Sequence, residues 1–212
     1  MTLRTDHTLD AALAALVEEF EGVFSPVAVE QCLNESYDQL LPARVTGYLP
    51  LLAHRFARER LRAASRVGAQ SGLGMDDPPL VLFVCGANSG RSQLAAALLA
   101  HLADDAIEVA SAGTMPAGQV QTEVTQALAE VGIETDSLFP KPLTREVETA
   151  ADVVVTMGCV EQVAVSGAPR RYLDWEVADP AGQDLDRVRE IRDEIEERVR
   201  GLLSDLAVQP RA

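Results

Sequence analysis

The sequence lacks the features of membrane-bound and secreted proteins. No apolar run approaches the roughly 20 residues that span a bilayer, and residues 1–10 do not have the layout of a signal peptide. Basic residues are also scarce, since 18 lysines and arginines stand against 33 acids, and Lys141 is the only lysine. The net charge of −15 repels polyanions at long range. We therefore expect a cytoplasmic protein that binds neither a membrane nor nucleic acid.

Cysteine is scarce as well. The three cysteines, Cys32, Cys85 and Cys159, form no C-x-x-C pair and have no histidine nearby at metal-ligand spacing. This absence argues against a structural zinc site, so no metal is predicted. An odd number of cysteines in a reducing compartment indicates free thiols, some of which can be chemically active. Cys32 lies mid-helix between apolar neighbours, which favours a core position over a chemical role.

The sequence does contain enough apolar residues for a core, and its composition changes once along the chain. Apolar residues make up 47% and charged residues 24%, the balance of a folded globular protein. A length of 212 residues suits two compact units. Turn-forming residues and a proline pair gather over 68–79, with little to bury. This predicts an N-terminal domain over 1–67, a linker over 68–79 and a C-terminal domain over 80–212.

The N-terminal domain is expected to be all-α. Three segments with helical apolar periodicity each precede a helix-ending residue: 9–21 before Gly22, 26–41 before Pro42, and about 49–67 before Gly68. Ser25 and Pro26 fit the N-cap and the first helical position. The pattern predicts a three-helix bundle. Because it contains no cluster of nucleophiles or ligands, we interpret it as a packing or dimerisation module.

The third predicted helix is rich in arginine: Arg55, Arg58, Arg60, Arg62 and Arg66. Such a cluster occurs in helices that contact DNA. Glu59 interrupts it, however, and the chain as a whole is acidic. A basic helix is more often a solvated face, which is the interpretation we favour.

The C-terminal domain alternates short β-branched runs with amphipathic helices, the pattern of βαβ units. Strands are expected at 80–84, 107–110, 152–157 and 171–173. Helices are expected at 92–102, 121–131, just after Thr144, and at 184–206. The sequence therefore predicts an α/β fold with a four-stranded parallel sheet and flanking helices, preceded by the three-helix bundle.

The loop after the first strand carries the clearest chemical signal. It reads Cys85-Gly-Ala-Asn-Ser-Gly-Arg91-Ser92 between a buried strand and a helix. Backbone N–H groups in such a loop can point at one tetrahedral oxyanion, and the helix N-terminus adds about half a positive charge. The predicted oxyanion-binding residues are Gly86, Ala87, Asn88, Ser89, Gly90, Arg91 and Ser92.

Each side chain of this loop has an expected role. The positive field favours the thiolate of Cys85 without a histidine partner. Arg91 supplies a planar fork for two oxygens of the anion, and Ser92 can donate its hydroxyl to the thiolate. Asn88 is expected to tie the loop together in a left-handed conformation. The alternative is a buried cysteine before a tight turn. The preceding strand, the following helix and Ser92 favour the anion site over it.

Residues 80–206 resemble the low-molecular-weight protein tyrosine phosphatase superfamily and, within it, the arsenate reductases. Beyond the Cys85 loop, the resemblance is carried by Ser111-Ala-Gly-Thr114, Val153-Val-Val-Thr-Met-Gly-Cys159 and Tyr172-Leu-Asp-Trp-Glu-Val-Ala-Asp-Pro-Ala-Gly182. It implies the fold of that superfamily, with Cys85 as nucleophile and Asp179 as the general acid that protonates the leaving oxygen. For Asp179-Pro180 alone, the alternative is a turn that starts a helix. Residues 1–67 resemble the helical extension of some actinobacterial members.

Two activities of this superfamily differ in what releases Cys85 from its adduct. A phosphatase uses water, whereas an arsenate reductase uses a second thiol that attacks the Cys85 sulfur. The first and third strands of such a sheet are expected to be neighbours, so Cys85 and Cys159 follow adjacent strand ends. A resolving role for Cys159 is our hypothesis, and a small buried apolar side chain is the alternative.

The resemblance favours the reductase. Gln93 stands where phosphatases usually have proline, Ala181 and Gly182 where they tend to place aromatics, and Gly90 where they commonly carry cysteine. No second cysteine follows near Val163, so an internal three-cysteine relay is not expected. The predicted partner is an arsenate- or phosphate-like oxyanion, and the reductant is an external thiol, thioredoxin or mycothiol, with no bound cofactor. The alternatives are a phosphatase acting on phosphomonoesters and a protein that only binds an oxyanion.

Overall fold

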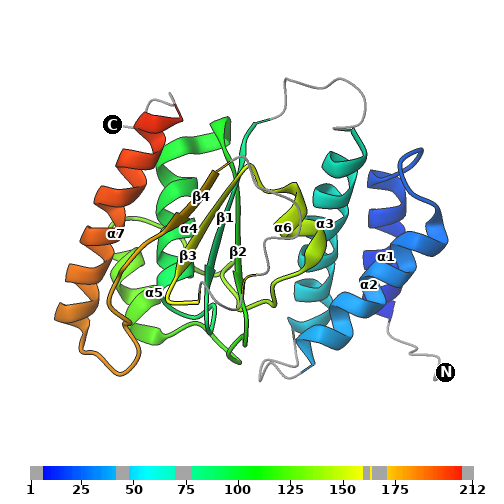
Figure 1. Cartoon of the computed structure of the whole chain (residues 1–212). Helices are drawn as coiled ribbons and strands as arrows, with labels where there is room; N and C mark the ends of the chain where they lie inside the picture. Colours follow the sequence, from blue (N-terminus) through cyan, green and yellow to red (C-terminus); the bar gives the residue numbers. More distant parts are fainter. Residues whose placement is uncertain (1–6, 42–47, 70–77, 160–162, 164–170, 207–212) are drawn as a thin grey trace.

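The computed structural model describes residues 7–41, 48–69, 78–159, 163 and 171–206. Three N-terminal helices lie beside a sheet that has helices on both faces (Figure 1). Most of the predicted linker, residues 70–77, lies outside the described part of the chain, as does Pro42.

The N-terminal helices are α1 (His7–Glu19), α2 (Pro26–Leu40) and α3 (Leu49–Ala69). The predicted N-cap of α2 is confirmed, because Ser25 Oγ accepts the Ala28 N–H at 3.2 Å. The predicted end of the third helix at Gly68 is wrong, since α3 continues through it to Ala69. One glycine costs a helix only about 1 kcal/mol, and Arg66 fixes this last turn by pairing with Glu108 and Asp152.

The sheet has four parallel strands in the order β2-β1-β3-β4. Their bounds are Leu80–Cys85 (β1), Glu108–Gly113 (β2), Val153–Met157 (β3) and Arg171–Asp174 (β4). The prediction of a four-stranded parallel sheet with adjacent first and third strands is confirmed. The second strand extends three residues beyond its predicted end, because small residues up to Gly113 keep pairing along β1 as far as Cys85.

The two faces of β1 pack against different helices (Figure 1). Val81 and Phe83 pack with residues of α4 (Arg91–Ala103), α5 (Thr122–Ala129) and α7 (Leu185–Asp205). Leu82 and Val84 pack with residues of the short helix α6 (Arg145–Ala150) and with Ala63 of α3. The third N-terminal helix therefore covers part of the sheet. A short 3-10 helix, η2 (Asp104–Ala106), joins α4 to β2.

The prediction that the arginines of α3 form a solvated face is wrong for Arg60 and Arg66, which are both largely buried. Arg60 is only 6% exposed and pairs with Glu146 Oε1 at 2.6 Å and with Glu35. Arg58 and Arg62 both pair with Glu19. The periodicity could not reveal these partners, because they come from α1, α2 and α6.

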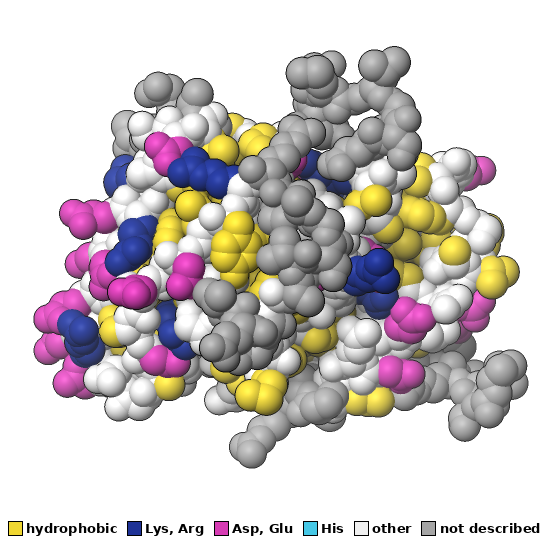
Figure 2. Space-filling model, viewed as in Figure 1, with side chains coloured by type: hydrophobic (Ala, Val, Ile, Leu, Met, Phe, Trp, Pro, Cys, Tyr) yellow, Lys and Arg dark blue, Asp and Glu magenta, His cyan; other side chains and the backbone are white. Residues whose placement is uncertain are grey.

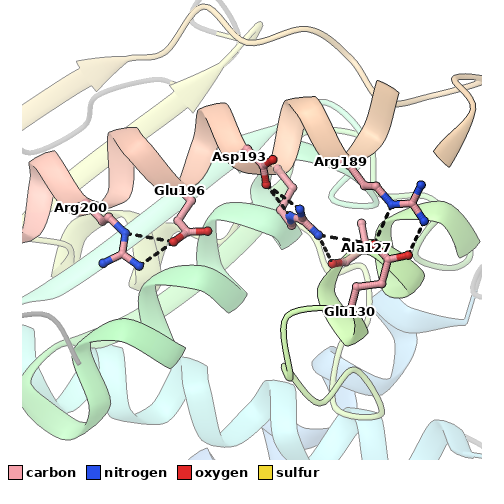
Figure 3. A network of polar contacts seen from close by, with 7 residues as sticks. Ala127, Glu130, Arg189, Asp193, Glu196 and Arg200 are labelled. Atoms are coloured by element: carbon pink, nitrogen blue, oxygen red, sulfur yellow. Dashed lines mark hydrogen bonds and ion pairs between the residues drawn. The ribbon is translucent and has the colours of Figure 1, made fainter. Parts of the chain in front are cut away.

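Charged side chains of both signs lie side by side over α7, at the left of the molecule (Figure 2). Arg189 of α7 pairs with Glu130, just after α5, with an Nε–Oε2 distance of 2.7 Å (Figure 3). The buried Arg192 donates to the Ala127 carbonyl at 2.8 Å. Cations at a helix C-terminus are favourable, so these arginines fix the end of α5 to α7. In the described part of the chain, no helix has both the length and the apolar character to cross a membrane.

Candidate active site

The predicted anion loop lies at the carboxyl edge of the sheet, between β1 and α4. β1 ends at Cys85 and α4 begins at Arg91, so the loop spans residues 86–90. This strand–loop–helix layout was predicted from the sequence. The structure adds how the loop is held.

The carbonyl groups of the loop are turned outward. Those of residues 85, 86, 87 and 89 accept hydrogen bonds from the N–H groups of residues 114, 115, 117 and 121, at 2.8–3.2 Å. The Asn88 carbonyl accepts from Gln93 Nε2 at 3.0 Å. In a trans peptide the N–H points away from the C=O of the same unit. The N–H groups of residues 86–90 therefore face the inner side of the loop, which makes a nest for an anion.

Asn88 is the hub of this loop. It is fully buried and has a left-handed backbone, with φ at 47°, as predicted. Its Nδ2 donates to Ser92 Oγ at 2.9 Å, and its Oδ1 accepts the Lys141 N–H at 2.9 Å and Gln93 Nε2 at 3.2 Å. The amide therefore ties the start of α4 to the segment that contains Lys141.

Ser92 is placed to donate to the Cys85 sulfur. The Ser92 Oγ and Cys85 Sγ atoms are 3.0 Å apart, and both side chains are buried. Ser92 Oγ accepts from Asn88 Nδ2, and its hydroxyl proton can be donated to the sulfur when the thiol is ionised. A hydrogen bond to an ionised acceptor is stronger than one to a neutral acceptor. This arrangement gives Cys85 Sγ a hydroxyl partner inside the loop.

Arg91 and Asp179 meet at the open side of the loop. Arg91 Nη2 donates to Asp179 Oδ2 at 2.6 Å, while Asp179 Oδ1 accepts the Ala181 N–H at 3.0 Å. A Cβ atom at Gly90 would lie 2.6 Å from Pro180 Cγ, so the Asp-Pro segment rests directly on the loop. Both carboxylate oxygens act as acceptors here. An oxyanion that takes the Arg91 fork would compete with Asp179 for it.

The residue before Cys159 also shapes the site. Gly158 has φ at +70°, and a Cβ atom there would lie 2.7 Å from Arg91 Nη1. A larger residue would strain the backbone and displace the guanidinium. The turn after β3 therefore leaves room for the Arg91 guanidinium because residue 158 is glycine.

Cys159 follows the end of β3, next to the end of β1. Its buried Sγ donates to the Val84 carbonyl at 3.4 Å, and both cysteines are free thiols. Burial raises the pKa of Cys159, and the nearby Cys85 acts in the same direction. The thiol lines a hollow of about 470 Å³ together with Gly86, Gly113, Thr114, Met115, Pro142, Leu143 and Gly158. The structure thus brings Cys159 to the same sheet edge as Cys85.

Gln93 and the segment around Lys141 were not predicted to support the loop. Gln93 is 1% exposed, and its Nε2 donates to the Phe139 carbonyl at 2.9 Å as well as to Asn88. The sequence marked Gln93 only as a departure from the phosphatase pattern. For Lys141 the available signal is that no other lysine occurs in the chain.

Cys32, the third cysteine, lies outside this site. Cys32 is half-buried in the core of the N-terminal helices, where burial raises its pKa, in agreement with the predicted core position. Among the described residues, no group of three or more His, Cys, Asp or Glu side chains is placed to hold a metal ion.

The fold and the loop define a candidate cysteine-centred oxyanion site on a parallel α/β sheet. Residues 80–211 match the family model described as low molecular weight phosphotyrosine protein phosphatase, and the chain belongs to this family. Residues 9–65 match a second model, the N-terminal domain of protein-tyrosine-phosphatase-like proteins.

Relatives within the family have more than one activity. A solved thioredoxin-dependent arsenate reductase from Corynebacterium glutamicum is 38% identical, covers 95% of this chain and 97% of its own, and gives a TM-score of 0.83. A candidate arsenate reductase from Halobacterium salinarum is 34% identical over 58% of this chain and 89% of its own. A protein-arginine-phosphatase from Bacillus subtilis is 31% identical over 59% of this chain and 95% of its own.

Proposed function

We propose that the protein is an arsenate reductase that uses Cys85 as its nucleophile and a second thiol to release the product. The observation that carries this proposal is that two free thiols, Cys85 and Cys159, lie at the ends of neighbouring strands, and that Cys85 begins the predicted anion loop. The similarity to the Corynebacterium glutamicum reductase over almost the whole chain supports it.

The first step follows from the loop. The N–H groups of residues 86–90 and the Arg91 guanidinium hold arsenate, and the Cys85 thiolate attacks arsenic. One arsenate oxygen leaves as water after receiving protons, and Asp179 is the proposed donor of one of them. For that role Asp179 must first leave Arg91 and gain a proton, since both of its oxygens accept hydrogen bonds here.

The second step needs another thiol. Its sulfur attacks Cys85 Sγ, the S–As bond breaks, and its two electrons pass to arsenic, which leaves as arsenite. We assign this role to Cys159, which would form a disulfide with Cys85. An external thiol then attacks that disulfide and regenerates both cysteines. Thioredoxin is the favoured reductant because the Corynebacterium relative depends on it. Mycothiol, which would instead attack Cys85 directly, is the alternative.

A phosphomonoester phosphatase remains the second candidate. The same Cys85, Arg91 and Asp179 would serve a phosphocysteine intermediate that water hydrolyses. The similarity to the Bacillus subtilis arginine phosphatase favours this possibility. Gln93, Ala181 and Gly182 in place of proline and aromatics favour the reductase.

Cys159→Ser tests the proposed relay, with Cys32→Ser as a matched control because Cys32 lies in the N-terminal helices. Each protein is assayed for arsenate reduction with thioredoxin or with mycothiol, and for aryl phosphate hydrolysis. We expect Cys159→Ser to abolish thioredoxin-coupled turnover and Cys32→Ser to retain it. If Cys159→Ser still turns over arsenate with mycothiol, an external thiol rather than Cys159 releases the product from Cys85. A wild-type protein that hydrolyses aryl phosphate but reduces no arsenate would overturn the proposed reductase function.

The organisation of the whole chain is also a proposal. We propose domains over 1–67 and 80–212 joined by a linker over 68–79, a cytoplasmic location, and a homodimer formed through the helical domain. Exposed apolar side chains in that region, including Val27, Tyr48 and Leu51, support the homodimer. Light scattering on the purified protein measures its mass directly, and a monomer at micromolar concentration would contradict it.

A further inference from the structure

Residues 139–143, which we call the strap, run past the active-site loop. The Lys141 N–H donates to Asn88 Oδ1 at 2.9 Å, and the Phe139 carbonyl accepts from Gln93 Nε2 at 2.9 Å. The strap therefore holds the two side chains that fix the conformation of the loop.

The strap is itself fixed to the edge of β2. The Lys141 carbonyl accepts the Gly113 N–H at 2.9 Å, and the Leu143 N–H donates to the Gly113 carbonyl at 3.0 Å. Gly113 and Pro142 form a parallel bridge. These bonds place the strap beside the sheet, so a shift of the strap would reach Asn88 directly.

The N-terminal helices hold the other side of the strap. Lys141 Nζ lies 2.9 Å from Glu59 Oε2 of α3, and the two side chains are 11% and 26% exposed. Phe139 packs against a cluster of apolar side chains that includes Leu40 of α2 and Phe56 of α3. Two independent contacts, one ionic and one apolar, therefore connect the helices to the strap.

The Glu59–Lys141 ion pair is largely shielded from solvent and lies beside the Phe139 ring. Burial raises the pKa of Glu59, while Lys141 acts against that shift. The Lys141 ammonium also lies 5.2 Å from the centre of the Phe139 ring. Because the pair is only partly exposed, removing one partner leaves the other charge incompletely solvated and disturbs its surroundings. A substitution at either residue should therefore move the strap.

We infer that Glu59 and Lys141 are positioning residues for the Cys85 thiol, and that α3 thereby sets the geometry of the active-site loop. The contacts run from Glu59 to Lys141, from Lys141 to Asn88, from Asn88 to Ser92 and from Ser92 to Cys85, each 2.9–3.0 Å long. The inference rests on the proposed role of Cys85 as the reacting thiol and is independent of arsenate as its substrate.

The test compares Glu59→Gln and Lys141→Met with a matched control, Glu19→Gln. Glu19 also pairs with α3, through Arg58 at 2.7 Å and Arg62, but has no contact with the strap among the described interactions. The readout is the rate at which iodoacetamide alkylates Cys85 as a function of pH. Trypsin releases residues 67–91, which contain Cys85 as their only cysteine, so mass spectrometry follows this thiol alone.

We expect both substitutions to shift the alkylation profile to higher pH and to slow alkylation at pH 7 roughly fivefold, the size expected for one weakened hydrogen bond. The double variant should be no slower than the slower single variant, because both residues act through one contact. Glu19→Gln should match the wild type. Unchanged profiles in Glu59→Gln and Lys141→Met would overturn the inference.

Two further measurements keep the outcome interpretable. If a variant fails to fold, as judged by circular dichroism, Glu59→Asp takes its place, since it keeps the charge and withdraws the carboxylate. An unchanged profile in that variant would also count against the inference. A wild-type protein that reduces no arsenate, combined with a shifted profile in Glu59→Gln, would remove the proposed function and leave the inference standing.

Discussion

The thiols of Cys85 and Cys159 lie at neighbouring strand ends, yet their surroundings differ. Cys85 Sγ faces the Ser92 hydroxyl at 3.0 Å and a loop whose N–H groups turn inward. Cys159 Sγ faces a carbonyl, that of Val84, at 3.4 Å, and burial raises its pKa. Donors stabilise a thiolate, whereas a carbonyl acceptor and burial stabilise the protonated thiol. One edge of a sheet thus holds two thiols in different surroundings, and burial raises the pKa of Cys159.

This difference suggests an order of reaction. A protonated Cys159 carries no negative charge, so it does not repel an oxyanion bound in the neighbouring loop. In the proposed reaction, Cys159 acts as a nucleophile only after it loses its proton near an adduct on Cys85.

The largest effect is expected from Cys85→Ser, which removes the thiolate. Arsenate reduction should fall to the uncatalysed background, because a serine hydroxyl is a far weaker nucleophile than a thiolate and cannot form the disulfide that supplies two electrons to arsenic. Calorimetry should still detect oxyanion binding, since the loop N–H groups and Arg91 remain. Cellular arsenate resistance that survives in this variant would instead indicate a protein that only binds the anion.

The next effect is expected from Gly158→Ala, which disturbs Arg91 from the Cys159 side. The new Cβ atom would lie 2.7 Å from Arg91 Nη1. Losing one well-placed donor to a developing oxyanion costs about a hundredfold in turnover. Gly132→Ala is the control, since Gly132 has φ at +79° but open space around it. Equal losses in the two variants would mean that backbone strain, rather than the Arg91 contact, is responsible.

The contrast itself can be measured by competitive alkylation of the wild-type protein. A thiol with an ordinary pKa is only a few per cent ionised at pH 7, and the pKa of Cys159 is raised further. We expect Cys159 to react at least about tenfold more slowly than Cys85 at pH 7, with the gap closing as the pH rises. Trypsin releases Cys159 within residues 146–170, separately from Cys85. Equal rates at pH 7 would refute the contrast.

A smaller effect than that of Gly158→Ala is expected from Ser92→Ala, which removes one donor from Cys85. A hydrogen bond to a charged group is worth about 1.5–3 kcal/mol, so alkylation of Cys85 at pH 7 should slow about tenfold or more and its profile should move to higher pH. Ser65→Ala is the control, because among the described residues the Ser65 hydroxyl donates to the Arg62 carbonyl of its own helix. A profile identical to the wild type would mean that the backbone N–H groups alone stabilise the thiolate.

The strands, most helices and the anion loop could be predicted from the sequence because their signals are local. The apolar run of β1, the N-cap at Ser25 and the Cys85-to-Arg91 spacing each lie within a few residues. The left-handed Asn88 was also predictable, since asparagine tolerates that conformation. Neither the pairing of β2 up to Gly113 nor the continuation of α3 past Gly68 has such a signal. Both depend on residues far away in the chain.

The sequence by itself determined the α/β architecture, the helical N-terminal region and the residues of the oxyanion loop, because periodicity and loop chemistry act over short distances. Tertiary structure decided what surrounds the two thiols: the outward carbonyls of the loop, the Arg91–Asp179 pair, and the contact from Glu59 through the strap to Asn88. These contacts join residues separated by up to 88 positions. Their physical basis is the packing of distant segments, which no local pattern encodes.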